Sequence, residues 1–567
     1  MEKHIACLCF TIVTFLFFNS CGQRAVETGA TYANPILAGF YPDPSLCRVG
    51  DDYYLVTSTF SYYPGVPIFH SRDLLHWQQI GYVLDRPEQL DLDGLGVSRG
   101  IFAPAIRHHG GVFYLTTTLV DGGGNFVVTA ANPAGPWSNP SWLPDVVGID
   151  PSLFFDEGGK AYIIFNGEPP EGRSLYDGHR ALWLYGFDTA SLTTVGPRIL
   201  VVNGGTDISQ KPIWIEGPHI FKKGGFYYLI AAEGGTGYDH SEVVFRATDV
   251  TGPYTSYSAN PILTQRHLDP KRENPITCTG HADLVETQNG QWWAVFLGCR
   301  PYDSYFFNTG RETFMAPVRW TDGWPVINPD AEEVQYSYQG PDLPSHQLDT
   351  YPLNGNFTLR DEFDADTLAL YWMFLRTLRE EWYSLTRSPG RLSLQLRPEM
   401  IYEKANPSFI GRRQQHLHCG ASLALDFTPN AENETAGIIA FQNETHYYYL
   451  GKTLVNGTAT VQLKNHENIL AEIALAPEDG EKPLYLKIEA RAGNYDFYYA
   501  TTPGSWQKLA ESVDGKVLST EVAGGFVGAF FGMYAGSQGK PSTNYANFDW
   551  FEYRGFDETF ERKEVAK

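Results

Sequence analysis

A short pattern recurs five times in the first half of the chain, and it constrains the fold more than any other feature. Each copy has a small or polar residue before a proline or alanine, then a polar or glycine-rich turn, then a strand rich in aromatic residues. A strand, a turn and a second strand make a hairpin. The copies begin at Asp43-Pro44, Ala103-Pro104, Asp150-Pro151, Gly217-Pro218 and His281-Ala282.

The spacing of the copies, roughly 50 to 65 residues, is typical of solenoids and propellers. No helical stretch separates the strands, so we predict an all-β, five-bladed β-propeller over residues 32–328. In a propeller, the first strand of each blade lines the central axis. The pattern therefore predicts that these residues surround one funnel: Asp43, Asp150, Glu216, His281, Phe102 and Ala103. Glu216 precedes the strict repeat position by one residue, a shift that the Gly217-Pro218 turn can absorb.

The pattern changes after the propeller. A linker rich in Pro, Asp, Glu and Gln is expected over residues 329–352, and short strands that alternate apolar and polar residues follow it, as in 484–490. Such alternation indicates strands with one buried face, and many of them without helices predict a β-sandwich over 353–556. The charged residues 557–567 are expected to form a frayed tail.

The charge of the chain excludes one class of partner. A net charge of −23 at pH 7 argues against a nucleic-acid backbone as ligand and suits a protein that acts on neutral molecules. Aromatic residues at 14%, together with 56 glycines, fit a β-rich chain with many turns.

Residues 1–20 have the features of an export signal. A lysine and a histidine precede an apolar run over residues 5–18, which is too short to span a membrane permanently. The run leads to Ser20-Cys21-Gly22, which resembles a bacterial lipoprotein signal with Cys21 as the lipidated first residue. The alternative is an ordinary signal peptide with an incidental cysteine. We expect an exported protein with a tether over 21–31, held by its lipid in the periplasm or at the outer-membrane surface.

Four further cysteines, Cys47, Cys278, Cys299 and Cys419, are widely spaced and form no Cys-x-x-Cys motif. They are interpreted as isolated core thiols, with a Cys278–Cys299 bridge as the alternative.

Three carboxylates around one axis indicate a chemical task, because buried carboxylates are costly and raise each other's pKa. Separated carboxyl groups, one acidic and one basic, are what glycoside cleavage needs. Aromatic residues near the funnel would stack on sugar faces: Phe60, Tyr62, Tyr63, Phe102 and Phe307. The competing task is metal binding, since carboxylates with His281 could hold a cation.

Several motifs, taken in order, resemble glycoside hydrolase family 43, in its β-xylosidase and α-L-arabinofuranosidase branch with a C-terminal concanavalin-like domain. In the first half they are Tyr41-Pro42-Asp43-Pro44-Ser45, Gly148-Ile149-Asp150-Pro151-Ser152, Trp214-Ile215-Glu216-Gly217-Pro218-His219, Gly280-His281-Ala282-Asp283 and Gly310-Arg311-Glu312-Thr313-Phe314. In the second half they are Arg412-Arg413-Gln414-Gln415-His416 and the run from Tyr545 to Phe551.

The resemblance implies a five-bladed propeller with an inverting mechanism and a concanavalin-like jelly roll behind it. It also implies roles for the carboxylates: Asp43 as general base, Glu216 as general acid, and Asp150 as the group that raises the pKa of the acid and orients it. An inverting enzyme leaves room for a water between base and acid.

The remaining site residues are expected either from the resemblance or from their place beside the funnel. Arg311 would donate to sugar hydroxyls near the base, or else form an ion pair with Glu312 or a nearby carboxylate. His281 would approach a central calcium ion or a water cluster, or else be a core histidine. The expected sugar-binding residues are Phe60, Phe102, Arg311, Phe307 and, from a sandwich loop that closes one side of the site, Phe530. Glu233 and His240 are candidates for the leaving-group side, and Phe102 stands where family members often carry Trp.

The sequence thus predicts an inverting exo-glycosidase that cuts β-1,4-xylo-oligosaccharides from the non-reducing end. Two alternatives remain open at this point. One is an α-L-arabinofuranosidase that acts on arabinoxylan or arabinan side chains, and the other is a surface glycan-binding lipoprotein with an inactive propeller.

Overall fold

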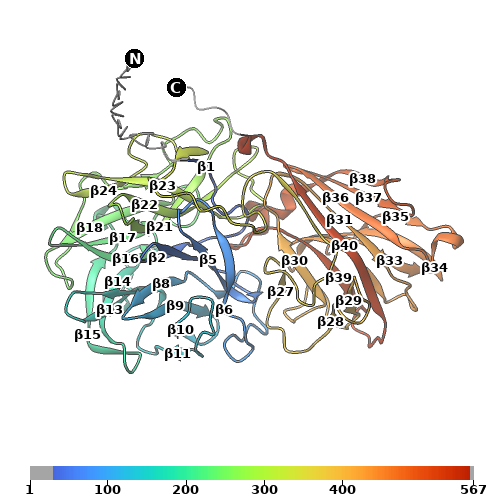
Figure 1. Cartoon of the computed structure of the whole chain (residues 1–567), viewed down its shortest axis with the longest axis horizontal. Coiled ribbons are helices and arrows are strands. Elements are labelled where there is room, and N and C mark those ends of the chain that lie inside the picture. The colour runs from blue at the N-terminus through green and yellow to red at the C-terminus, as the bar shows by residue number, and fades with distance from the viewer. Residues whose placement is uncertain (1–29, 562–567) are drawn as a thin grey trace, which may run out of the picture.

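A computed structural model describes residues 30–561, and it shows two β domains side by side (Figure 1). The predicted signal peptide, the lipid-bearing Cys21 and the last six residues lie outside the described range. Within it, the only α-helix is α1 (Thr520–Ala523), a single turn. No helix in the described range has both the length and the apolar character that crossing a bilayer requires. The predicted all-β class is confirmed.

Five antiparallel sheets form the five blades that the repeats predict. Blade 1 comprises β2 (Ser45–Val49), β3 (Asp52–Val56), β5 (Gly65–Ser71) and β6 (Gln78–Leu84). Blade 2 comprises β7 (Gly100–Ile101), β8 (Ala105–His109), β9 (Val112–Val120), β10 (Gly124–Ala130) and β11 (Ser141–Trp142). Blade 3 comprises β12 (Ile149–Phe155), β13 (Ala161–Gly167), β14 (Ala181–Asp188) and β15 (Thr193–Asn203).

Blade 4 comprises β16 (Glu216–Lys223), β17 (Phe226–Glu233), β18 (Ser241–Ala247), β19 (Thr255–Ser256) and β20 (Leu263–Thr264). Blade 5 comprises β21 (Thr277–Glu286), β22 (Trp292–Cys299), β23 (Glu312–Thr321) and β24 (Trp324–Ile327). The inner strands β2, β8, β12, β16 and β21 contact one another in that order, and β21 contacts β2. The ring of inner strands is therefore closed around a central pore.

Four of the blades share one unusual backbone conformation at the repeat position, which lies just before β2 and within β12, β16 and β21. The residue at the repeat position has a positive φ in each case: Asp43 (54°), Asp150 (55°), Gly217 (56°) and His281 (51°). The strand ladders shift register at these points in β12, β16 and β21, which marks bulges. Glycine adopts this conformation freely, and Asp and His tolerate it better than most residues. The bulge explains the one-residue offset of Glu216, because Gly217 takes the left-handed position and the carboxylate precedes it.

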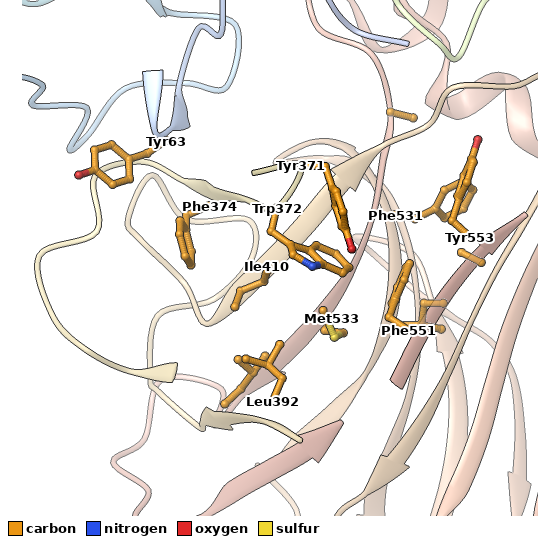
Figure 2. Close-up of a cluster of buried hydrophobic side chains, with 14 of the residues drawn as sticks. Tyr63, Tyr371, Trp372, Phe374, Leu392, Ile410, Phe531, Met533, Phe551 and Tyr553 are labelled. Atoms are coloured by element: carbon orange, nitrogen blue, oxygen red, sulfur yellow. The ribbon is translucent and has the colours of Figure 1, made fainter. Parts of the chain in front are cut away.

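The second domain is a sandwich of two eight-stranded sheets. One sheet contains β26 (Phe357–Asp361), β28 (Tyr383–Ser384), β29 (Leu392–Gln395), β31 (His418–Asp426), β36 (Leu484–Arg491), β37 (Asn494–Ala500), β38 (Gln507–Asp514) and β40 (Tyr545–Gly555). The other contains β4 (Tyr62–Tyr63), β27 (Met373–Leu375), β30 (Phe409–Arg413), β32 (Thr435–Asn443), β33 (His446–Val455), β34 (Thr458–Lys464), β35 (Ile469–Ala474) and β39 (Phe530–Gly536). Alternate apolar residues from the two sheets meet in the core, where Phe531 and Met533 of β39 lie near Phe551 of β40 (Figure 2).

The two domains share a sheet. Strand β4 leaves the propeller and pairs with β27 of the sandwich, with Tyr63 opposite Phe374 (Figure 2). Near the N-terminus, β1 (Thr31–Ala33) pairs with β25 (Ser337–Gln339), which lies inside the expected linker. The β4–β27 pairing fixes the sandwich against one side of the propeller, and the β1–β25 pairing ties the linker to the first described strand.

The C-terminal residues differ from the expected frayed tail over 557–567. Asp557 is buried, and its Oδ2 accepts a hydrogen bond from Nη1 of Arg300 at 2.8 Å. The 3-10 turn η5 (Glu558–Phe560) follows and buries Phe560. The expectation of a frayed tail was wrong for residues 557–560. Composition alone does not show that Asp557 forms a buried ion pair with Arg300 of the propeller.

Candidate active site

A cavity of about 430 Å³ opens at the pore end where the repeat positions converge. It brings together all three predicted carboxylates, Asp43, Asp150 and Glu216, although they come from three different blades. The predicted residues Phe60, Phe102, His281 and Arg311 also line it. The three carboxyl groups meet here because each lies at the repeat position of its blade or next to it.

Asp43 is held as a carboxylate. Its Oδ2 accepts a hydrogen bond from Oγ of Ser58 at 2.5 Å, and its Oδ1 accepts one from Nη1 of Arg311 at 3.1 Å. Nδ1 of His281 lies 3.9 Å from Oδ1. Burial by itself would raise the pKa of Asp43, but Arg311, His281 and the Ser58 hydroxyl outweigh it and leave the pKa lowered. Asp43 is therefore ionised at neutral pH.

Glu216 is held in the opposite way. Burial, followed by the negative charge of Asp43, raises the pKa of Glu216 to about 7, while Arg311 and Arg180 oppose the shift. Burial and the charges of Glu216 and Asp43 also raise the pKa of Asp150 well above its ordinary value. Asp150 and Glu216 therefore keep a proton that isolated carboxyl groups would lose. Carboxyl groups whose environments drive their pKa values apart can act as a base and an acid in the same site.

Asp150 also supports the backbone beside the acid. Its Oδ2 accepts a hydrogen bond from the N–H of Gly217 at 3.1 Å. This bond pins the bulge that carries Glu216, so Asp150 orients the neighbouring carboxyl group through the main chain.

Aromatic side chains form the apolar wall of the cavity. Phe60 lies 5.1 Å from Phe102 and stacks on Phe526 at 5.7 Å between ring centroids. Trp214 lines the cavity as well, with the Arg180 guanidinium 4.2 Å from its ring. Trp214 and Phe526 were not among the predicted site residues. The sequence did offer a signal for Trp214, because it stands two residues before the predicted acid Glu216.

Four predicted sugar-binding aromatics do not line the cavity: Tyr62, Tyr63, Phe307 and Phe530. Tyr62 and Tyr63 form β4, which pairs with the sandwich. Phe530 is fully buried and stacks on Tyr62 at 4.0 Å, because it is the first residue of strand β39. The loop before that strand supplies Phe526 instead, so the prediction of a sandwich aromatic was misplaced by four positions. Phe307 is buried against Cys278 and Cys299.

The other candidates have structural partners. Glu233 is buried, and its Oε2 accepts a hydrogen bond from the N–H of Thr206 at 2.9 Å. Nδ1 of His240 lies 2.9 Å from the carbonyl oxygen of Cys278. Neither residue lines the cavity. The cysteines in the described part of the chain are all unbridged and buried, including Cys278 and Cys299.

The residues at the axis do not fit a directly bound calcium ion. Calcium takes six to eight oxygen ligands, and residues 30–561 contain no group of three or more His, Cys, Asp or Glu that could hold a metal. His281 faces Asp43, whose carboxylate already has Arg311 as its counter-ion. A calcium ion at the axis would therefore lack the cluster of carboxylate and imidazole ligands that direct binding by side chains requires.

An ionised carboxylate and a protonated carboxyl group, set into one aromatic-walled cavity, define the class: the chain is a glycoside hydrolase. Residues 32–325 match the family model of glycosyl hydrolases family 43, and residues 360–554 match the β-xylosidase C-terminal concanavalin A-like domain. The chain belongs to glycosyl hydrolase family 43.

Proteins similar over nearly the whole chain agree with this assignment. A xylosidase/arabinosidase of Butyrivibrio fibrisolvens is 43% identical over 526 residues, which cover 91% of this chain and 98% of that protein. A non-reducing end α-L-arabinofuranosidase of Bacteroides ovatus is 40% identical over 535 residues, covering 93% of this chain and 95% of that protein. The crystal structure of a xylan β-1,4-xylosidase from Bacillus halodurans, 34% identical, superposes with a TM-score of 0.84 and covers 92% of this chain and all of that one.

Proposed function

We propose that this enzyme is an inverting exo-glycosidase that releases xylose from the non-reducing end of β-1,4-xylo-oligosaccharides. In the proposed mechanism, Asp43 takes a proton from a water molecule, and the water oxygen bonds to the anomeric carbon. The glycosidic C–O bond breaks at the same time, and Glu216 gives its proton to the leaving oxygen. Asp150 holds Glu216 in place through the Gly217 hydrogen bond, while burial and the charge of Asp43 keep Glu216 protonated.

The observation that carries the proposal is the opposite protonation of two carboxyl groups in one cavity. The pKa of Asp43 is lowered and that of Glu216 is raised to about 7. A base must be ionised and an acid must be protonated before the reaction starts, and this pair meets both conditions near neutral pH. Arg311 lies beside the base, where it can also donate to a sugar hydroxyl.

Exo action is supported by the way the sandwich closes the site. Phe526 enters the cavity wall from the second domain and packs against Phe60 and Phe102. A chain that had to pass through the site would meet this aromatic cluster. A chain end would fit, with its terminal sugar against the rings and the next sugar on the side of Trp214.

A second candidate activity, α-L-arabinofuranosidase, has its own support. One relative is named for both xylosidase and arabinosidase activity, and another for arabinofuranosidase activity alone. D-xylopyranose and L-arabinofuranose have similar hydroxyl layouts, so the same base, acid and Arg311 can serve both sugars.

The decisive experiment compares Glu216→Gln with the parent on xylobiose and on an α-L-arabinofuranosyl disaccharide, because a sugar leaving group needs a proton whereas nitrophenolate leaves readily without one. Loss of the general acid should lower kcat on both by roughly 10²- to 10⁴-fold. Glu286→Gln is the matched control, since Glu286 lies exposed at the outer end of inner strand β21. Equal activity of Glu216→Gln and the parent would remove the assigned role.

The stereochemical course is tested separately by NMR of the first product. Inversion at the anomeric carbon is expected when Asp43 activates a water. A retained configuration would overturn the base role of Asp43. The ratio of the two parent kcat/KM values decides between the xylosidase and the arabinofuranosidase.

We also propose that the enzyme is exported and anchored by lipid at Cys21. The apolar run before Cys21 and the glycine after it support this location. Membrane fractionation of the parent and Cys21→Ser tests it. Retention of Cys21→Ser in the membrane fraction would refute the anchor.

A further inference from the structure

A second ring of side chains lies below the active-site carboxylates. Residues two positions past the repeat positions face the pore again, because side chains alternate along a strand. These residues are Ser45, Ser152, His219 and Asp283, from the inner strands of blades 1, 3, 4 and 5, and all are buried. The inner strand of blade 2 contributes Arg107.

Arg107 ties the five blades together. Its Nη1 donates to Oδ2 of Asp283 at 2.8 Å and to Oγ of Ser45 at 3.2 Å. Its Nη2 donates to Nδ1 of His219 at 2.8 Å and lies 3.5 Å from Oγ of Ser152. One guanidinium from blade 2 thus reaches a side chain of each of the other four blades.

The protonation states of His219 and Asp283 suit a positively charged guanidinium between them. Burial lowers the pKa of His219 to about 3, so the imidazole is neutral and its Nδ1 accepts from Arg107. Burial alone would raise the pKa of Asp283, but the charge of Arg107 and the hydrogen bonds from Arg107 and Ser45 outweigh it and lower the pKa. The ring therefore contains one positive and one negative charge.

The oxygen atoms of this ring have few lone pairs left to bind a metal ion. Oδ2 of Asp283 also accepts from Oγ of Ser45 at 2.7 Å and from the N–H of Leu46 at 3.1 Å. A divalent cation placed here would have a single carboxylate as its anionic ligand and would face a fixed guanidinium.

We propose that the Arg107 guanidinium is the cation that holds the inner strands together in the pore, in the role that a bound calcium ion would otherwise have. Its work is to neutralise Asp283 and to join the five inner strands beneath the active-site cavity. Arg107 is therefore a positioning residue, and the parent enzyme binds no calcium at the axis. The inference does not depend on which pentoside is cleaved, and its main readouts are binding and melting temperature.

The first test uses the parent protein. After treatment with EDTA, calcium chloride is titrated by calorimetry, and Tm and activity are measured with and without the ion. We expect no stoichiometric binding and no change in Tm or kcat. Stoichiometric calcium binding that His281→Ala abolishes would overturn the proposal.

The second test removes the cation. Arg107→Ala leaves Asp283 buried without a counter-ion, so we expect Tm to fall by roughly 5 °C or more. Guanidinium chloride at millimolar concentration should recover part of the loss. Arg48→Ala is the matched control, because Arg48 is an exposed arginine on inner strand β2 and its hydrogen bond goes to the carbonyl oxygen of Gly50. It should change neither Tm nor the response to guanidinium.

A third variant keeps the test decisive if Arg107→Ala does not fold. Arg107→Lys retains the charge but loses the fork that reaches both Asp283 and His219. We expect an intermediate Tm and no recovery with guanidinium. A Tm equal to that of the parent in either Arg107 variant would overturn the proposal.

Discussion

Gly217 lies against the imidazole of His281, so closely that a Cβ atom on residue 217 would be 2.8 Å from Cε1 and Nε2 of the ring. The two residues hold the same repeat position on neighbouring inner strands. Gly217 also has a φ of +56°, which disfavours any side chain. The absence of a side chain here lets Glu216 and His281 share one end of the pore.

Gly217→Ala should therefore harm catalysis as well as stability. The matched control is Gly224→Ala, because Gly224 has a φ of +57° but nothing within 4 Å of its would-be Cβ. We expect the control to lose about 1 kcal/mol of stability with kcat unchanged. Gly217→Ala should lose more and lower kcat by roughly tenfold or more, since the acid is displaced. Equal kcat in the two variants, measured beside their thermal unfolding, would contradict the close-contact argument.

The pH dependence of kcat/KM should be bell-shaped. Glu216 must be protonated to act, and its pKa is about 7, so activity should fall as pH rises above about 7. Asp43 must be ionised, and its lowered pKa should preserve activity down to the ordinary carboxylate range. Stability has its own sign: because Glu216 holds its proton more tightly when folded, its contribution falls as pH rises from its ordinary pKa toward about 7.

Arg180 gives a way to move the alkaline limb of that profile. Its charge opposes the raised pKa of Glu216, so Arg180→Ala should shift the limb to higher pH. Glu168→Gln is the control, since it removes the ion pair with Arg180 at 3.6 Å but leaves the guanidinium on the Trp214 ring and on the carbonyl oxygen of His179. A limb that moves to lower pH in Arg180→Ala would rule out this electrostatic role.

Much of the architecture could be predicted because a repeat is a direct record of the blades. The spacing of the Asp-Pro and Gly-Pro signals placed Asp43, Asp150 and Glu216 on inner strands. Closure of the ring of blades then brings these three side chains into one cavity. The alternation of side chains along the strands also predicts the four ring residues that lie two positions past the repeat positions. Arg107 lies four residues past its repeat position, Ala103, and no proline beside it marks it as a ring member. Its role depends on distances to other blades, which no local pattern gives.

The misplaced sandwich aromatic has a different cause. Phe526 and Phe530 stand in one aromatic and glycine-rich run, and only the start of β39 decides which ring reaches the cavity. Strand boundaries depend on pairing partners far away in the chain, here β30 and β32. Such a boundary could not be fixed from the run itself.

The two phenylalanines should therefore respond differently to truncation. Phe526→Ala opens the cavity wall, so we expect KM for a disaccharide to rise while Tm changes little, because the ring is only partly buried. Phe530→Ala removes a buried ring stacked on Tyr62 and should cost roughly 3–5 kcal/mol of stability. Steady-state kinetics and denaturant unfolding of both variants check the assignment, which a reversed pattern would refute.

The last prediction concerns the C-terminal residues, which join the domains through charge. Deleting residues 562–567 is the control and should leave Tm unchanged. Deleting 557–567 removes Asp557 from the buried Arg300, whose Nε also donates to Glu312 at 2.6 Å, and should cost roughly 3 kcal/mol.

Asp557→Asn separates the charge in this contact from the packing of Phe560. Burial opposes ionisation of Asp557, yet a hydrogen bond with His418 and the charge of Arg300 hold its pKa well below the ordinary value. A lowered carboxyl pKa adds stability that is present above the unfolded pKa and is lost as pH falls through the folded one. The stability gap between parent and Asp557→Asn should therefore be wide at pH 7 and should shrink below about pH 4. A gap that is the same at both pH values would mean that the contact acts through packing alone.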